Sequence, residues 1–171
     1  MIKQGMTHEI EVSINGEKFQ RTVKARRLLV HFIRDELGLT GTHVGCDTGN
    51  CGACSIIFNG RLLKSCMLLA VQAHGAEIET VEGLARDGQL SHLQESFHQH
   101  HGLQCGYCTP GMLMSATYLL RQNPEPTDEE IRQGIRGNIC RCTGSVNIVR
   151  SIRAAAASPR GVARVAKEEG R

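Results

Sequence analysis

Alternation of hydrophobic and polar residues dominates the first eighty residues and predicts β-structure there. Ile10, Val12 and Ile14 alternate with polar neighbours, as the inward face of a half-buried strand does. Asn-Gly pairs at 15–16 and 59–60 are strong signals for tight hairpin turns. The segments predicted as strands are 10–14, 19–23, 55–58, 61–64 and 76–81. This pattern indicates two hairpins and one further strand.

Apolar residues recur at helical spacing over 27–37 and again after about residue 83. Gly38 is placed to end the first helix. The pairs that match a capping box, Ser91 with Gln94 and Thr127 with Glu130, mark the starts of two later helices. Thr109-Pro110 places a cap and a first-turn proline before another helix. The predicted helices therefore cover 27–37, 91 to about 101, 112–122, 127 to about 135, and 146–157.

The change from alternating to helical spacing predicts an α+β chain of two domains. We expect a β-sheet domain with one helix over residues 1–82 and an all-helical domain over 83–157. Residues 158–171 are small and charged, so we expect them to be mobile or to order only against a partner. The length of 171 residues suffices for two small domains.

Charge and hydropathy argue against two functional classes. The net charge is +3, and residues 158–171 hold four basic and two acidic residues, so the remaining chain is nearly neutral. A nucleic-acid-binding face is therefore not expected. No apolar run is long enough for a transmembrane segment, and residues 1–5 lack the core of a signal peptide. We expect a cytoplasmic protein, which would reach the inner face of a membrane only through a complex.

The cysteine content is the most informative feature of the composition. The chain has eight cysteines, no tryptophan and 4% aromatic residues, so side-chain packing alone gives a thin core. In a reducing compartment, cysteines at this density are metal ligands more often than disulfides. None of them is isolated beside a histidine partner, so a catalytic thiol is not expected.

The first four cysteines have the spacing of a known iron–sulfur motif. Cys46, Cys51 and Cys54 form C-x4-C-x2-C, and Cys66 follows beyond the second hairpin. This is the plant-type ferredoxin spacing for a [2Fe–2S] cluster. Three thiolates on one tight loop can point at one small cluster while the intervening amides donate hydrogen bonds to sulfur. Glycines in this loop supply the backbone conformations that a β-carbon resists.

The other four cysteines lie just before two predicted helices, as Cys105-x2-Cys108 and Cys140-x-Cys142. Amide dipoles at helix N-termini favour anionic sulfur. Zinc sites usually pair two C-x2–4-C knuckles, and neither set has that form, so zinc is the less favoured alternative. A Rieske centre needs two histidines, and only His43 lies near the first set. Histidines 92, 98, 100 and 101 share one predicted helix, where we expect a solvated face.

Three strings of residues resemble the iron–sulfur subunits of the molybdenum hydroxylases, the xanthine oxidase family. They are GTHVGCDTGNCGAC (41–54), HGLQCGYCTPGM (101–112) and GNICRCTG (137–144). The resemblance runs from about Glu9 to about Ala155. It implies a plant-ferredoxin-like β-grasp domain followed by an all-α helical-bundle domain, each with one [2Fe–2S] cluster. Ser145-Val146 departs from the aromatic-led pair that usually follows C-R-C-T-G in this family.

Within the family, three segments look most like small subunits of the aerobic carbon monoxide dehydrogenase type. These segments are 28–34, 40–54 and 66–82. Small subunits of aldehyde and N-heteroaromatic (nicotine, caffeine, purine-like) dehydrogenases are close alternatives. A free-standing ferredoxin-like carrier is a remoter alternative, because the first domain alone would suffice for that role. A zinc-bound interaction module is a third class.

The resemblance also implies a division of labour among chains. A large subunit would carry a molybdopterin (dinucleotide) cofactor and a medium subunit FAD, in a dimer of heterotrimers. This chain would relay electrons between them, with no catalytic residue or substrate site of its own. Gln104 and Cys142 match positions that touch the pterin. The cluster nearer molybdenum would be bound by Cys105, Cys108, Cys140 and Cys142, and the cluster nearer flavin by Cys46, Cys51, Cys54 and Cys66.

Overall fold

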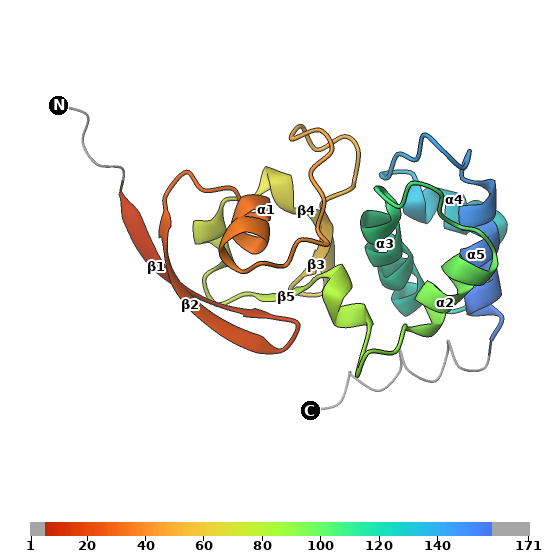
Figure 1. The fold of residues 1–171 in the computed structure, drawn as a ribbon, viewed down its shortest axis with the longest axis horizontal. Coiled ribbons are helices and arrows are strands. Elements are labelled where there is room, and N and C mark those ends of the chain that lie inside the picture. Colours follow the sequence, from red (N-terminus) through yellow and green to blue (C-terminus); the bar gives the residue numbers. More distant parts are fainter. Residues whose placement is uncertain (1–5, 159–171) are drawn as a thin grey trace.

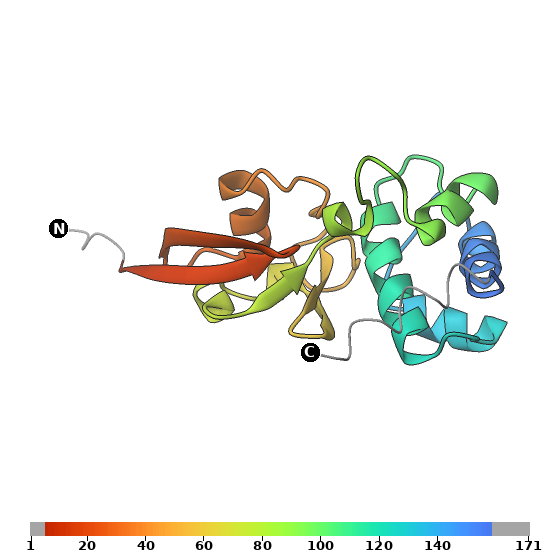
Figure 2. The same ribbon diagram turned by 90° about the horizontal axis from the view of Figure 1, so that it is seen from below.

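Two hydrophobic cores organise the chain, one beneath a β-sheet and one among helices. The computed structural model describes residues 6–158, so the prediction for the tail lies, apart from Ser158, outside the described residues. The sheet and the helices of residues 92–156 occupy opposite ends of an elongated molecule in both views (Figures 1 and 2). No helix within residues 6–158 is long and apolar enough to cross a membrane.

Within the described residues, five strands form one sheet in the order β2-β1-β5-β3-β4. The strands are β1 (Thr7–Ile14), β2 (Glu17–Lys24), β3 (Ser55–Phe58), β4 (Arg61–Lys64) and β5 (Glu77–Glu79). β5 pairs parallel with β1 and antiparallel with β3, and so joins the two hairpins into one sheet. The alternation that predicted β1 is confirmed, because Ile10, Val12 and Ile14 are each at most 2% exposed.

Both predicted hairpin turns are confirmed by their backbone angles. Asn15 and Gly16 have φ of 54° and 85°, and Asn59 and Gly60 have φ of 46° and 72°. A type I′ turn needs positive φ at both central positions, which asparagine and glycine tolerate best. The turns fix the register in which β1 pairs with β2 and β3 with β4.

The helix predicted over 27–37 is not uniform. It begins as α1 (Leu29–His31) and continues as a π-helical stretch, Phe32–Glu36. The Leu37 amide donates to the Phe32 carbonyl at 3.2 Å, and this spacing of five residues between donor and acceptor is that of a π-helix. The segment ends as expected at Gly38, where φ is +74°. Leu29, Phe32 and Ile33 pack into the core with the buried face of β1.

The second half contains α2 (His92–Gln99), α3 (Thr109–Gln122), α4 (Asp128–Ile135) and α5 (Val146–Ala156). Both predicted capping boxes are present, at Ser91 and Thr127. The predicted cap at Thr109 is wrong, because Cys108 occupies the cap position and α3 already begins at Thr109, ahead of the range 112–122 that we predicted. Thr109 therefore lies in the first turn, and its buried hydroxyl has no hydrogen-bond partner.

The two halves are joined by polar contacts and by very close backbone packing. Arg121 of α3 donates to Glu79 of β5, with 2.7 Å between Nη2 and Oε2. A β-carbon at Gly111 of α3 would collide with the carbonyl oxygen of Gly52. Glycine at 111 thus lets the start of α3 approach the loop that carries the first three cysteines.

Candidate metal centres

The first set of thiols is gathered by one loop and the end of a hairpin. Cys46, Cys51 and Cys54 lie on the loop before β3, and Cys66 lies in the helical turn after β4. Ser65 holds these two segments together, because its hydroxyl donates to the Cys54 carbonyl at 2.8 Å. Cys54 and Cys66 are 2% and 4% exposed. Both form a small buried cluster with Val30, so this side of the set is apolar.

The outer side of this loop already favours a thiolate. The Cys46 sulfur accepts hydrogen bonds from the amides of Thr48 and Cys51, at 3.5 and 3.3 Å. Hydrogen bonds from Thr48, followed by that from the Cys51 amide, lower the pKa of Cys46 to about 6. A β-carbon at Gly45 would lie 2.8 Å from the Cys51 sulfur, so only glycine leaves room for that thiol.

The thiols of the first set interact in two pairs. Burial, followed by interaction with the Cys54 thiol, raises the pKa of Cys66 to about 11. Burial also raises the pKa of Cys51, and the neighbouring Cys46 thiol adds to that effect. Cys54 therefore lies with Cys66 on the buried side, and Cys46 lies with Cys51 nearer the surface.

The second set shows the same division into an inner and an outer pair. The sulfurs of Cys105 and Cys142, both exposed, are 3.4 Å apart. Cys108 and Cys140 are partly buried and pack against the second hydrophobic core. Burial, and after it the Cys140 thiol, raises the pKa of Cys108 to about 12.

Thr143 and Tyr107 stabilise negative charge on two thiols of the second set. Burial acts to raise the pKa of Cys140, but hydrogen bonds from the Thr143 hydroxyl and amide, from the Cys142 backbone and from the Cys108 thiol together lower that pKa. The two Thr143 atoms lie 3.2 and 3.5 Å from the Cys140 sulfur. A hydrogen bond from the Tyr107 backbone, followed by one from the Cys142 thiol, lowers the pKa of Cys105.

The pairing of thiols within each set matches the ligand arrangement of a two-iron cluster. Tetrahedral zinc needs four ligands around one point. A [2Fe–2S] cluster takes two ligands on each iron, which matches two adjacent pairs per set. His98, His100 and His101 are exposed, in keeping with the solvated helix face that we expected. The prediction is wrong for His92, which is half-buried and whose two ring nitrogens are buried.

Hydrogen bonds from the backbone and from one side chain connect the two ligand loops directly. The Ile139 amide, next to Cys140, donates to the Cys51 carbonyl at 2.8 Å. The Asn138 side-chain amide donates to the Gly52 carbonyl at 2.9 Å. Sequence reasoning gave Asn138 no role, because only its position before Cys140 distinguishes it from a surface asparagine.

His43 provides a second connection between the loops. Its ring stacks on that of Tyr107 with 4.7 Å between centroids. The Tyr107 hydroxyl donates to the Val44 carbonyl at 2.6 Å, and His43 Nδ1 lies 2.8 Å from the Tyr107 carbonyl oxygen. His43 is therefore placed as a link between loops. Gln104 is exposed beside Cys105, and its contact with a pterin stays a prediction.

Comparison with known proteins places the chain in the class of [2Fe–2S] electron-transfer subunits of the molybdenum hydroxylase type. The family description "[2Fe-2S] binding domain" matches residues 80–153. The chain is 53% identical over 150 residues to caffeine dehydrogenase subunit gamma of Pseudomonas sp. (strain CBB1), covering 86% of this chain and 90% of that one. It is 50% identical over 144 residues to the nicotine 6-hydroxylase small subunit of Paenarthrobacter nicotinovorans, covering 84% and 87%.

A solved structure agrees with these relatives. A chain of quinoline 2-oxidoreductase from Pseudomonas putida 86 matches with a TM-score of 0.88 and 43% identity, over 96% of this chain and 99% of that one. This match confirms the α+β fold with a ferredoxin-like domain. The chain belongs to the small iron–sulfur subunits of xanthine-oxidase-family dehydrogenases, which work in multi-subunit oxidoreductase complexes.

Proposed function

We propose that this chain relays single electrons from a molybdopterin centre on a large subunit to FAD on a medium subunit. The observation that carries the proposal is the arrangement of eight thiols as two sets of two pairs, joined by the hydrogen bond from Ile139 to Cys51. Each pair would hold one iron of a [2Fe–2S] cluster. The proposed sets are Cys46, Cys51, Cys54 and Cys66 in a domain over 1–82, and Cys105, Cys108, Cys140 and Cys142 in a domain over 83–157.

A bound [2Fe–2S] cluster supplies one-electron transfer. The residues of this chain hold the thiolates, partly exclude water and place hydrogen-bond donors on sulfur. Such donors and burial are the means by which a protein sets a cluster's potential. Thr48 is one of the donors in the first set, and Thr143 is one in the second.

The exposure of Cys105 and Cys142 supports an orientation for the relay. These two thiols reach the surface beside the exposed Gln104, so a pterin on another chain can approach them. We infer that the second set faces the molybdopterin, with Cys142 and Gln104 in contact with it. The first set then faces the flavin. We keep the dimer of heterotrimers and the cytoplasmic location as parts of this proposal.

Three of the matches favour one substrate class for the complex, while others are aldehyde oxidoreductases. Two relatives are named for caffeine and nicotine, and the matching solved structure is named for quinoline. All three compounds are N-heteroaromatic. We therefore propose an N-heteroaromatic dehydrogenase complex, in preference to the carbon monoxide type that local sequence resemblance favoured. The residues that select the substrate would lie on the large subunit.

Metal analysis and spectroscopy test the relay. The purified chain should contain about four irons with matching acid-labile sulfide. Dithionite reduction should give two distinct [2Fe–2S] paramagnetic resonance signals. Cys66→Ser should remove or change one signal, and its matched partner Cys142→Ser the other. Two irons, bound zinc, or one variant altering both signals alike would overturn the assignment.

The native complex separates a subunit from a free carrier. If the proposal is right, this chain co-purifies with a molybdenum-bearing and a flavin-bearing chain from its own cells. A free-standing carrier would purify alone. The co-purifying complex should oxidise an N-heteroaromatic compound, and activity on carbon monoxide alone would overturn that part of the proposal.

A further inference from the structure

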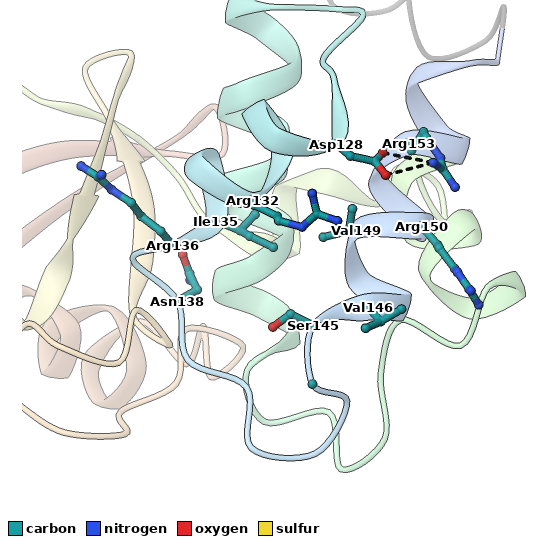
Figure 3. Close-up of a pocket in the computed structure, with 11 residues that line it drawn as sticks. Asp128, Arg132, Ile135, Arg136, Asn138, Ser145, Val146, Val149, Arg150 and Arg153 are labelled. Carbon is teal, nitrogen blue, oxygen red and sulfur yellow. Dashed lines mark hydrogen bonds and ion pairs between the residues drawn. The ribbon is translucent and has the colours of Figure 1, made fainter.

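A groove between α4 and α5 lies outside both thiol sets and is lined by arginines (Figure 3). Its volume is about 480 Å³. The arginines that line it are Arg132, Arg136, Arg150 and Arg153. Asp128 is the one acidic residue among the lining residues that the structure describes. We refer to this surface as the arginine groove.

Only one of these arginines has a strong acidic partner. Arg153 Nη1 lies 3.1 and 3.0 Å from the two carboxylate oxygens of Asp128. Arg132 lies 3.8 Å from Glu129, and both of those side chains are more than half exposed. Exposed pairs at that distance are worth little. The charge of Arg132 therefore remains available to another carboxylate.

The other two arginines are also without acidic partners in the described part of the chain. Arg136 donates to the neutral side-chain oxygen of Gln133 at 3.2 Å. Arg150 has no hydrogen bond or ion pair with any residue in 6–158. Three arginines on this surface thus have no strong counter-charge within the described residues, and arginine is the side chain best suited to bind carboxylates in a bidentate manner.

The guanidinium groups spread along the surface and do not converge on a point. In Figure 3, Arg132 crosses the gap toward α5, Arg150 extends outward from α5, and Arg136 extends away toward the sheet. Such spacing does not suit a compact ion, but it suits an extended chain with several carboxylates. Ile135 and Val149 form an apolar part of the lining, and Val146 is 57% exposed. Arginine and exposed apolar side chains together are typical of protein–protein interfaces.

We propose that the arginine groove docks an acidic segment of the large subunit, an inference that rests on the proposed function for the existence of that chain. The groove borders the second ligand loop, since Gly144 and Asn138 are among its lining residues. A segment bound there would hold the large subunit against Cys105 and Cys142. Complementary charge of this kind steers association and fixes the relative orientation of two proteins.

Charge disfavours the other polypeptide occupants. Residues 159–171 hold four basic and two acidic residues, so the tail of this chain carries the same sign as the groove. A second copy is also a poor partner, because the whole chain has a net charge of +3. An acidic segment of a different chain is the occupant that the charges favour.

Charge reversal tests the proposal in the native complex. A tagged chain with Arg132→Glu and Arg150→Glu, expressed in its own cells, should retain the large subunit roughly tenfold less strongly than wild type. The matched control is Arg21→Glu on β2, at the opposite end of the molecule (Figure 1), and it should behave as wild type. Equal retention of the large subunit by both variants over a range of salt concentrations would overturn the proposal.

The iron content separates this inference from the proposed function. If the wild-type chain holds about four irons and the reversal variant still binds its partner, the relay stands and the groove proposal fails. If the wild-type chain lacks iron or purifies alone, the proposed function itself fails. Loss of iron from the reversal variant would also overturn the groove proposal, because the variant would then be defective in the chain's own folding.

A cross-link identifies what occupies the groove. Arg132→Lys and Arg150→Lys keep the charge and introduce amines that a carbodiimide couples to adjacent carboxylates. Mass spectrometry of the purified complex should find these amines linked to aspartate or glutamate of the large subunit. Links to Glu168 or Glu169, to a second copy, or to no chain would overturn the proposal. A charge-reversal variant that still binds the large subunit but no longer binds vesicles of anionic lipid would also overturn the proposal.

Discussion

Asn138 uses both ends of its side-chain amide to join separate parts of the chain. Its nitrogen donates to the Gly52 carbonyl at 2.9 Å, and its oxygen accepts from the Ser115 hydroxyl at 2.7 Å. Ser115 is fully buried in α3. Asn138 thereby fixes the first ligand loop against α3, two residues before Cys140. It is a positioning residue, whose effect on the thiols is exerted through the backbone.

Truncating this side chain should loosen the contact between the two ligand loops. Asn138→Ala leaves the buried Ser115 hydroxyl without its acceptor, which costs about 1–3 kcal/mol of stability. It also removes the donor that ties the Gly52 carbonyl to the second loop, although that carbonyl still accepts from Ser55. We expect a lower apparent Tm and a weaker magnetic interaction between the two reduced clusters, with the iron content unchanged. Ser115→Ala is the matched control, because it removes one hydrogen bond and should have a smaller effect. Equal effects of the two substitutions would contradict the positioning role.

The individual thiols show what spacing can and cannot predict. The spacing of Cys46, Cys51 and Cys54 predicts that they share a loop, because three residues so close in sequence have few other arrangements. It does not predict that Cys105 lies 3.4 Å from Cys142, since that contact depends on how α3 and α5 pack. The contact between His43 and Tyr107 joins residues 64 positions apart and leaves no local pattern. Such contacts become visible only in the folded chain.

At the level of elements, sequence motifs predicted turns and helix starts correctly where the stabilising hydrogen bonds join residues close in sequence. The Asn-Gly turns and the capping boxes are decided within four residues, and all four were predicted correctly. The start of α3 was predicted wrongly, because Cys108 takes the cap position while its thiol faces the second core. The π-helical stretch after α1 follows the packing of Phe32 and Ile33 on the sheet, which apolar spacing does not specify.

The capping box of α4 gives a prediction that concerns one helix. Thr127→Ala removes the hydroxyl that accepts from the Glu130 amide, at a cost of about 1 kcal/mol. The apparent Tm of the cluster-loaded chain should fall by roughly 2–8 °C at a fixed scan rate. Thr127→Ser keeps the oxygen and should behave nearly as wild type. If both variants melt alike, the box does not stabilise α4.

The stability that this capping box contributes depends on pH, and the pKa of Glu130 sets the direction of that dependence. Hydrogen bonds from the Thr127 backbone, and after it the Thr127 hydroxyl, lower the pKa of Glu130 below its ordinary value of 4.5. A lowered carboxyl pKa stabilises the folded state above pH 4.5, and this contribution is lost as the pH falls through the lowered value. The contribution is therefore complete at neutral pH.

At the scale of the whole molecule, the thiols are part of the cores that hold it together. Cys54 and Cys66 form a buried cluster with Val30, and Cys108 and Cys140 pack on the second core. The chain has 4% aromatic residues and no tryptophan, so these cores are built mainly from aliphatic side chains, with Phe32 and Phe97 as fully buried rings. Metal bound by the inner thiols would tie loops together at points where apolar packing is thin.

Removal of iron should therefore weaken the fold, because metal-binding free energy is also folding free energy in small metal-binding domains. We expect the apo-chain to have a lower apparent Tm and faster exchange of the Ile139 amide, and iron with sulfide to restore both. Burial raises the pKa of Cys66 to about 11 and of Cys108 to about 12, so both thiols are protonated at neutral pH without metal. Ligation releases these protons, so reconstitution should become more favourable as the pH rises from 7 to about 8.5. An apo-chain that melts and exchanges like the loaded protein would show that the clusters contribute nothing to folding.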